Sequence, residues 1–163
     1  MVAYATRVPA GFAGSVSRAD SMTIEQEQID SGTPPTAYGQ AVKIVSGKLQ
    51  PLASGDAGTV AYGWLVRPYP SQSSTNAFGA ATPPTSGIAD VLRRGFMTVP
   101  LKLGTAAKNG QVYVVTTAGG DVVVGDIVTA ASPAGGGTAV AITNAFFVGP
   151  ADANGIVEIA YKV

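Results

Sequence analysis

Four carboxylates near the start of the chain have the spacing that most suggests chemistry. They are Asp20, Glu25, Glu27 and Asp30. Glu25 and Glu27 stand two positions apart, so on a strand they share one face, where they could bind a hard cation or act as an acid–base pair. No glycine-bounded loop here fixes several oxygens around one point. We therefore favour a solvated polar face and expect no metal site.

The other residue types that carry catalysis are sparse. The chain has no histidine and no cysteine, which removes the commonest general base, the commonest metal ligand and the thiolate nucleophile. The glycine-rich run 134–138 lacks the GK[ST] ending and the following helix of a phosphate-binding loop, and no GxSxG elbow occurs. A serine–lysine dyad has no local signature and stays open. We expect a protein that is not an enzyme and holds no cofactor.

Arginines are the other residues that could bind a charged partner. Arg93 and Arg94 are adjacent, so on a strand they point to opposite faces, and one of them can pair within the chain. Arg7 and Arg18 lie in the N-terminal stretch. Surface arginine is often merely solvated, but it is also enriched at protein interfaces, where its planar fork meets carboxylates. Both uses stay open.

The composition indicates one lightly charged domain. The 163 residues are 46% apolar but only 12% charged, and ten basic residues balance ten acidic ones. Without a net field, nucleic acid and membrane surfaces are poor partners, whereas near-zero charge favours assembly. The N-terminus lacks a signal-peptide pattern, and no apolar run has the roughly 20 residues of a membrane helix. We expect a protein that is made in the cytoplasm and works in an assembly.

Short strands must position these residues, because 21 glycines and 11 prolines leave little room for helices. Apolar side chains alternate with others over 157–163, which predicts a half-buried strand. The segment 59–67 is apolar on both faces, which predicts a strand buried on both sides. Tyr62 and Trp64 share one of those faces, so we expect their rings in the core.

Turn residues separate the remaining strands. Ser46-Gly47 between the runs 42–45 and 48–52 predicts a hairpin. Further β-branched or aromatic runs, each bounded by Gly, Asn or Pro, lie at 91–99, 111–117, 121–130, 138–148 and 156–163. This spacing predicts a mostly β, single-domain fold, either a β-sandwich or a small barrel, of jelly-roll-like type.

We divide the chain into an extended N-terminal arm over 1–35 and a β-rich core domain over 36–163, with a long loop at 68–89. Within the arm, Thr23 could open a short helix with Gln26 as its capping partner, and an extended segment is an equal alternative. The serine- and proline-rich loop has a length that is uncommon unless it is functional or disordered. Both segments could become ordered on a partner.

Several segments together have a familiar pattern. They are 7–14, 17–18, 34–39, 62–70, 91–99 and 110–114. In these segments the chain resembles the structural cement, or decoration, proteins of tailed-bacteriophage heads. The resemblance spans nearly the whole chain but contains no chemical signature.

The resemblance implies a virion structural protein that binds the outer surface of the capsid and stabilises the coat-protein lattice. Its partner would be the phage major capsid protein, its state on the capsid a homodimer or homotrimer, and its place of assembly the host cytoplasm. An arm that pairs with an exposed sheet edge would gain a ladder of hydrogen bonds. The candidate capsid contacts are Tyr4, Arg7, Phe12 and Arg18 in the arm and Tyr69 and Phe78 in the loop.

Alternatives remain at this stage. Tyr4 and Phe12 could pack on the protein's own core instead of on a coat subunit. The whole chain could be a receptor- or glycan-binding β-module of a phage fibre or baseplate. A small hydrolase would need Asp, Ser or Lys gathered in one pocket.

Overall fold

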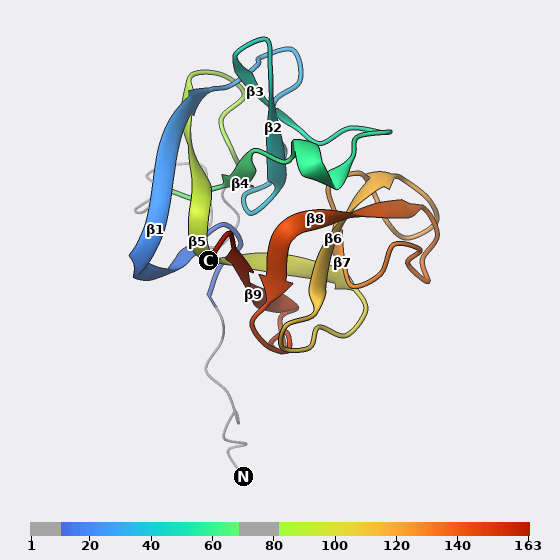
Figure 1. Cartoon of the computed structure of the whole chain (residues 1–163). Coiled ribbons are helices and arrows are strands. Elements are labelled where there is room, and N and C mark those ends of the chain that lie inside the picture. Colours follow the sequence, from blue (N-terminus) through green and yellow to red (C-terminus); the bar gives the residue numbers. More distant parts are fainter. Residues whose placement is uncertain (1–10, 69–81) are drawn as a thin grey trace.

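The computed structural model describes residues 11–68 and 82–163, and these form a mostly β domain (Figure 1). Its only helical element in the described residues is a single 3-10 turn, η1 (Gly58–Val60). The strands are β1 (Val16–Gln28), β2 (Ala41–Val45), β3 (Lys48–Pro51), β4 (Gly63–Leu65), β5 (Ile88–Leu103), β6 (Gln111–Thr117), β7 (Ile127–Val128), β8 (Thr138–Phe147) and β9 (Ile156–Tyr161). The expectation of a mostly β single domain is confirmed.

The pairing of five strands closes a small barrel. β5 pairs in parallel with β7, β7 with β6, β6 with β8, β8 with β9, and β9 returns to β5. Closure removes the free edges that an open sheet of the same strands would expose. The parallel pair distinguishes this ring from a jelly roll, whose two sheets are antiparallel.

A second group of strands extends from the same long strand. β5 also pairs with β1 and β4, β4 pairs with β2, and β2 pairs with β3. A parallel bridge from Ile29, just beyond β1, to Leu49 in β3 completes this group. Gly95, with φ of +131°, lies in the middle of β5, after the residues that pair with β4 and at the start of those that pair with β9. Figure 1 shows β5 running from the second group into the barrel.

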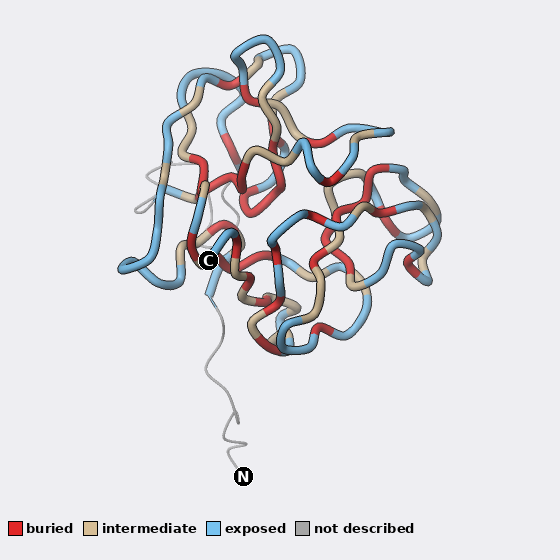
Figure 2. Tube along the Cα trace, viewed as in Figure 1, coloured by how far each residue is buried: buried red, intermediate tan, exposed pale blue. Residues whose placement is uncertain are grey.

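The barrel and the second strand group each have a hydrophobic core cluster. The barrel and its junction with β4 contain the largest cluster, which includes Trp64, Phe147 and Tyr161. The second group encloses a smaller cluster around Leu49 and Val91. Most of β1 lies outside both clusters and is exposed along its length (Figure 2).

Several sequence predictions match the structure closely. The hairpin at Ser46-Gly47 joins β2 to β3, and both turn residues have positive φ, 51° and 76°. β9 buries Val157, Ile159 and Tyr161 on one face, as the alternation predicts. Trp64 is fully buried in β4.

Other segments differ from the prediction for local reasons. Within 121–130 only β7 is a strand, because the Asp126 carboxylate accepts the N–H of Val123 and closes a turn. The start of 59–67 forms η1, whose Gly58 lies against the backbone of β8. The expected loop at 68–89 ends at Gly87, because β5 already begins at Ile88.

The N-terminal segment also departs from a separate arm. Residues 16–28 form β1 and pair with β5, so the short helix considered at Thr23 is absent. Ile29, also within 1–35, is only 3% exposed and belongs to the smaller core cluster. The part of the expected arm that the structure describes therefore lies on the sheet.

Candidate functional site

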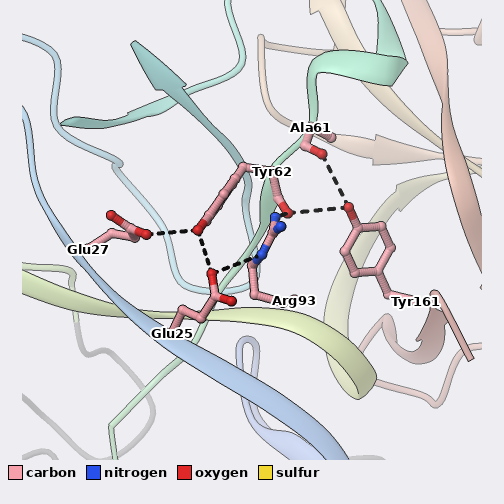
Figure 3. A network of polar contacts seen from close by, with 6 residues as sticks. All are labelled: Glu25, Glu27, Ala61, Tyr62, Arg93 and Tyr161. Carbon is pink, nitrogen blue, oxygen red and sulfur yellow. Dashed lines mark hydrogen bonds and ion pairs between the residues drawn. The ribbon is translucent and has the colours of Figure 1, made fainter. Parts of the chain in front are cut away.

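A network of polar side chains joins β1 to the rest of the second strand group (Figure 3). The Tyr62 hydroxyl lies against both carboxylates of β1, contacting Glu25 and lying 2.8 Å from Glu27 Oε1. Arg93 of β5 lies over the Tyr62 ring at 3.5 Å and its Nε is 3.1 Å from Glu25 Oε2. Its Nη1 donates to the Tyr62 carbonyl oxygen. The prediction that Glu25 and Glu27 share a face is confirmed.

The charges of this network do not cancel. Two carboxylates face one guanidinium, which leaves an excess of one negative charge beside the Tyr62 hydroxyl. The hydrogen bond to Glu25, then burial and then the hydrogen bond to Glu27 raise the pKa of Tyr62 above its ordinary value. Each of these contacts favours the protonated hydroxyl, so Tyr62 is a donor and not a base.

The geometry of the network suits holding β1 in place. Within the described residues, no three acidic side chains gather where they could hold a metal ion. Tyr161 of β9 donates to the Ala61 carbonyl at 3.2 Å, which ties the segment before β4 to the barrel as well. The same cluster therefore links β1, the segment before β4, β5 and β9. Across all the residues that the structure describes, no helix is long and apolar enough to cross a membrane.

A second arginine holds the beginning of β1. Arg18 donates to both oxygens of Glu158 in β9, at 3.0 and 2.9 Å, and its guanidinium lies 4.1 Å from the centre of the Phe96 ring. Ser17 donates to the same carboxylate at 2.6 Å. The fork-to-fork geometry fixes direction as well as distance. The first residues of β1 are thus attached to β9, and the two bonded residues are 140 positions apart in the sequence.

The segment before β1 is held by its backbone, and we call residues 11–15 the N-terminal clamp. Gly14 donates its N–H to the Thr98 carbonyl at 2.7 Å and accepts the Arg67 N–H at 2.8 Å. The N–H of Thr98 donates to the Ser15 carbonyl oxygen. The guanidinium of Arg67 lies 5.2 Å from the centre of the Phe12 ring. The clamp therefore fixes the backbone of residues 11–15 against the domain.

The family model of the XM1 gp53 minor capsid protein matches residues 1–161. The chain belongs to this family. The family is one of phage-head structural proteins, so the resemblance noted in the sequence is confirmed and the protein is a phage capsid structural protein.

Structural comparison agrees on the fold. A chain in a solved structure of the capsid of Myoviridae phage XM1 superposes with a TM-score of 0.70, covering 98% of this chain and 96% of that chain. The two sequences are 21% identical, so this similarity speaks for the fold. A search among curated proteins finds no match.

The six candidate capsid contacts fall into two groups. Tyr4, Arg7, Tyr69 and Phe78 lie outside the described residues. The structure describes the other two: Phe12 lies in the clamp against Arg67, with 42% of its surface exposed, and Arg18 lies in β1 against Glu158. Arg18 therefore has an ionic partner within the chain. The internal pairing that the sequence predicted for one of Arg93 and Arg94 is found at Arg93, which pairs with Glu25.

Three residues of the site carry no sequence signal of their role. Thr98 and Glu158 are isolated polar residues in apolar strands, and Arg67 precedes a proline. A polar residue that interrupts a β-branched run suggests a specific partner, but it does not say which one. The pairing of β5 with β9 places Thr98, which bonds to the clamp, opposite Glu158, which bonds to Arg18.

Proposed function

We propose that this capsid protein is a cement, or decoration, protein that binds the outer surface of the phage head and stabilises its coat-protein lattice. The observation that carries the proposal is the family match over nearly the whole chain. The proposed partner is the major capsid protein.

The clamp supports a division of labour within the molecule. It fixes residues 11–15 by backbone bonds to β5 and to the strand group of β4, so the ten residues before it start from a defined point. We propose that Tyr4 and Arg7 in this segment contact coat subunits. Each such contact is weak alone, but many copies on one shell would add up to a large effect on its stability.

The test uses heads from a phage that lacks the gene for this protein. Purified protein is added back, and the bound amount and the temperature at which the heads break open are measured. Binding to the outer surface with a rise in that temperature supports the proposal. Saturating protein that neither binds nor protects the heads would refute it, and specific binding to glycans instead would favour a receptor-binding module.

Deletion of residues 1–10 tests the contact of the N-terminal segment separately. This deletion spares every described bond of the clamp, whereas a deletion through residue 18 would remove Gly14 and Arg18. We expect normal folding and weaker binding to heads. The matched control is Arg94→Gln, an exposed arginine of β5, which should leave binding unchanged.

The oligomeric state and the lack of catalysis belong to the same proposal. A homodimer or homotrimer on the capsid suits the balanced charge of the chain, since ten basic residues face ten acidic ones. The absence of histidine and cysteine from the sequence supports a role without catalysis. Sedimentation of the free protein and imaging of decorated heads measure the oligomeric state.

A further inference from the structure

The backbone of β1 has one side bonded and one side turned outward over residues 23–28. Ile29 N–H donates to the Gly87 carbonyl at 2.8 Å, which fixes the residues whose backbone groups face β5. The residues whose backbone N–H and C=O groups point to the neighbouring strand alternate along a strand, so the backbone groups of Glu25 and Glu27 also point to β5. The residues between them turn their N–H and C=O groups to the other side: Ile24, Gln26 and Gln28.

The bonding of β5 agrees with this alternation. Asp90 lies opposite Gln26, and its carbonyl oxygen accepts a hydrogen bond from the Val66 N–H on the β4 side at 2.9 Å. Asp90 therefore turns its backbone away from β1, as an antiparallel partner of Gln26 must when both are at a non-bonded position. The outward direction of the Gln26 groups thus rests on two independent bonds.

This edge of β1 has no strand beside it in the described part of the chain. β1 pairs only with β5 over 23–28, and the bridge to β3 comes after it, at Ile29. Gln26 and Gln28 are exposed, and the stretch contains no proline, lysine or glycine. Edge strands are usually blocked by such residues or by bulges. The bulges of β1 lie before Ile24, so the edge from 24 to 28 is regular.

We propose that the edge of β1 at residues 24–28 binds an extended segment of the coat protein as an added strand. The inference rests on the proposed capsid-binding function and names the surface that would receive a coat segment. Main-chain bonds to Ile24, Gln26 and Gln28 would supply the affinity, as in other cases of strand addition. The interaction is distinct from that of residues 1–10, which lie on the other side of the clamp in the sequence.

The charge of the neighbouring side chains defines the partner's chemistry. Glu25 and Glu27 share the face that contacts Tyr62, and among the described residues only Arg93 compensates their charge there. The excess negative charge favours a lysine or arginine on the added strand, opposite Glu27, because opposite charges on facing positions stabilise a strand pair. The occupant is therefore an extended coat segment that carries a basic residue.

A second copy of this chain fits the edge poorly. In an antiparallel pair of two β1 strands, outward residues must face outward residues, so 24, 26 and 28 can only face one another. Every such register that uses two or more of them places Glu25 opposite Glu25, Glu25 opposite Glu27, or Glu27 opposite Glu27. Like charges directly opposite destabilise a strand pair.

The test compares Gln26→Pro with Gln26→Ala in binding to heads that lack the protein. Both variants remove the side chain, but only proline removes the outward N–H, and that N–H makes no bond to β5. We expect Gln26→Ala to bind heads like the wild type and Gln26→Pro to bind at least about tenfold more weakly. Equal binding of the two variants would refute strand addition while leaving the capsid-binding function intact.

Amide hydrogen exchange supplies a readout that does not depend on the proline variant. The amides of Gln26 and Gln28 should exchange fast in the free wild-type protein and become protected when it is bound to heads. Protection already present in the free protein, or none in the bound protein, would overturn the proposal. A concentration-dependent dimer that Gln26→Pro abolishes would assign the edge to a second copy instead. Wild-type protein that fails to bind heads at all would refute the capsid-binding function itself.

Discussion

Gly14 is the residue on which the N-terminal clamp depends most. Its φ is +80°, and a Cβ added to it would lie 2.7 Å from Tyr38 Cβ and 2.9 Å from the Gly39 nitrogen. Two of its backbone groups bond to Thr98 and Arg67. Substitution by alanine therefore adds both a strained backbone and an atom for which there is no room.

The magnitude of Gly14→Ala follows from these two effects. A left-handed backbone costs a non-glycine residue about 1 kcal/mol, and forcing neighbouring backbone apart costs about 2 kcal/mol more. We expect a loss of about 3 kcal/mol, which in a domain of this size lowers the melting temperature by about 9 °C. The matched control is Gly47→Ala, where φ is +76° but nothing lies within 4 Å of the added Cβ. It should lose only about 1 kcal/mol.

The assay is urea unfolding of both variants with amide exchange at Arg67. The Arg67 N–H is protected by Gly14, so detachment of the clamp alone accelerates its exchange, by about a hundredfold for 3 kcal/mol. Either global destabilisation or this local effect would support the reasoning. If Gly14→Ala is no less stable than Gly47→Ala and the exchange rate of the Arg67 amide is unchanged, the backbone around Gly14 is not packed as tightly as its contacts indicate.

Three further predictions concern side chains. Tyr62→Phe should cost about 1 to 2 kcal/mol in urea unfolding, because two carboxylates lose their shared donor; wild-type stability would contradict the role of the network. A double-mutant cycle of Arg18→Gln and Glu158→Gln should give a coupling of about 0.5 to 1 kcal/mol that shrinks in high salt, and a zero coupling would show that this ion pair does not hold the beginning of β1. Burial acts to raise the pKa of Asp56, but hydrogen bonds from Lys43 and a backbone N–H hold it below its ordinary value. A lowered folded-state pKa stabilises above the unfolded value and is lost as the pH falls, so Asp56→Asn should destabilise at pH 7 and progressively less below about pH 4; a pH-independent difference would be inconsistent with this.

Local patterns predicted the elements whose conformation depends on neighbours in sequence. The Ser46-Gly47 turn needs positive φ at two adjacent residues, and the flanking runs supply the strands, so this hairpin is encoded within a dozen residues. β9 is similarly visible, because alternation alone decides which side chains face a core. Where a local hydrogen bond competes, as at Asp126, the apolar pattern misleads.

The candidate site was only partly visible for the same reason. The sequence placed Glu25 and Glu27 on one face, and this holds. It also predicted that one of Arg93 and Arg94 pairs within the chain, and Arg93 pairs with Glu25. It did not indicate that Tyr62 would turn its hydroxyl toward the carboxylates. Nor did it pair Arg18 with Glu158, since a strand pattern gives the face of a residue but not the strand that lies beside it.

The sequence by itself determined a β-rich, lightly charged chain without the residue types of common catalysis, and it carried the resemblance to phage-head proteins. The tertiary structure decided that β5 is shared between a closed barrel and a second strand group and that Gly14 anchors the N-terminal segment. It also decided that, among the described residues, no strand pairs with the outer edge of β1. The physical reason is that periodicity fixes side-chain faces over a few residues, whereas backbone edges are matched between segments far apart in the chain. Any β-strand has two edges, and only the assembled sheet determines which of them stays free.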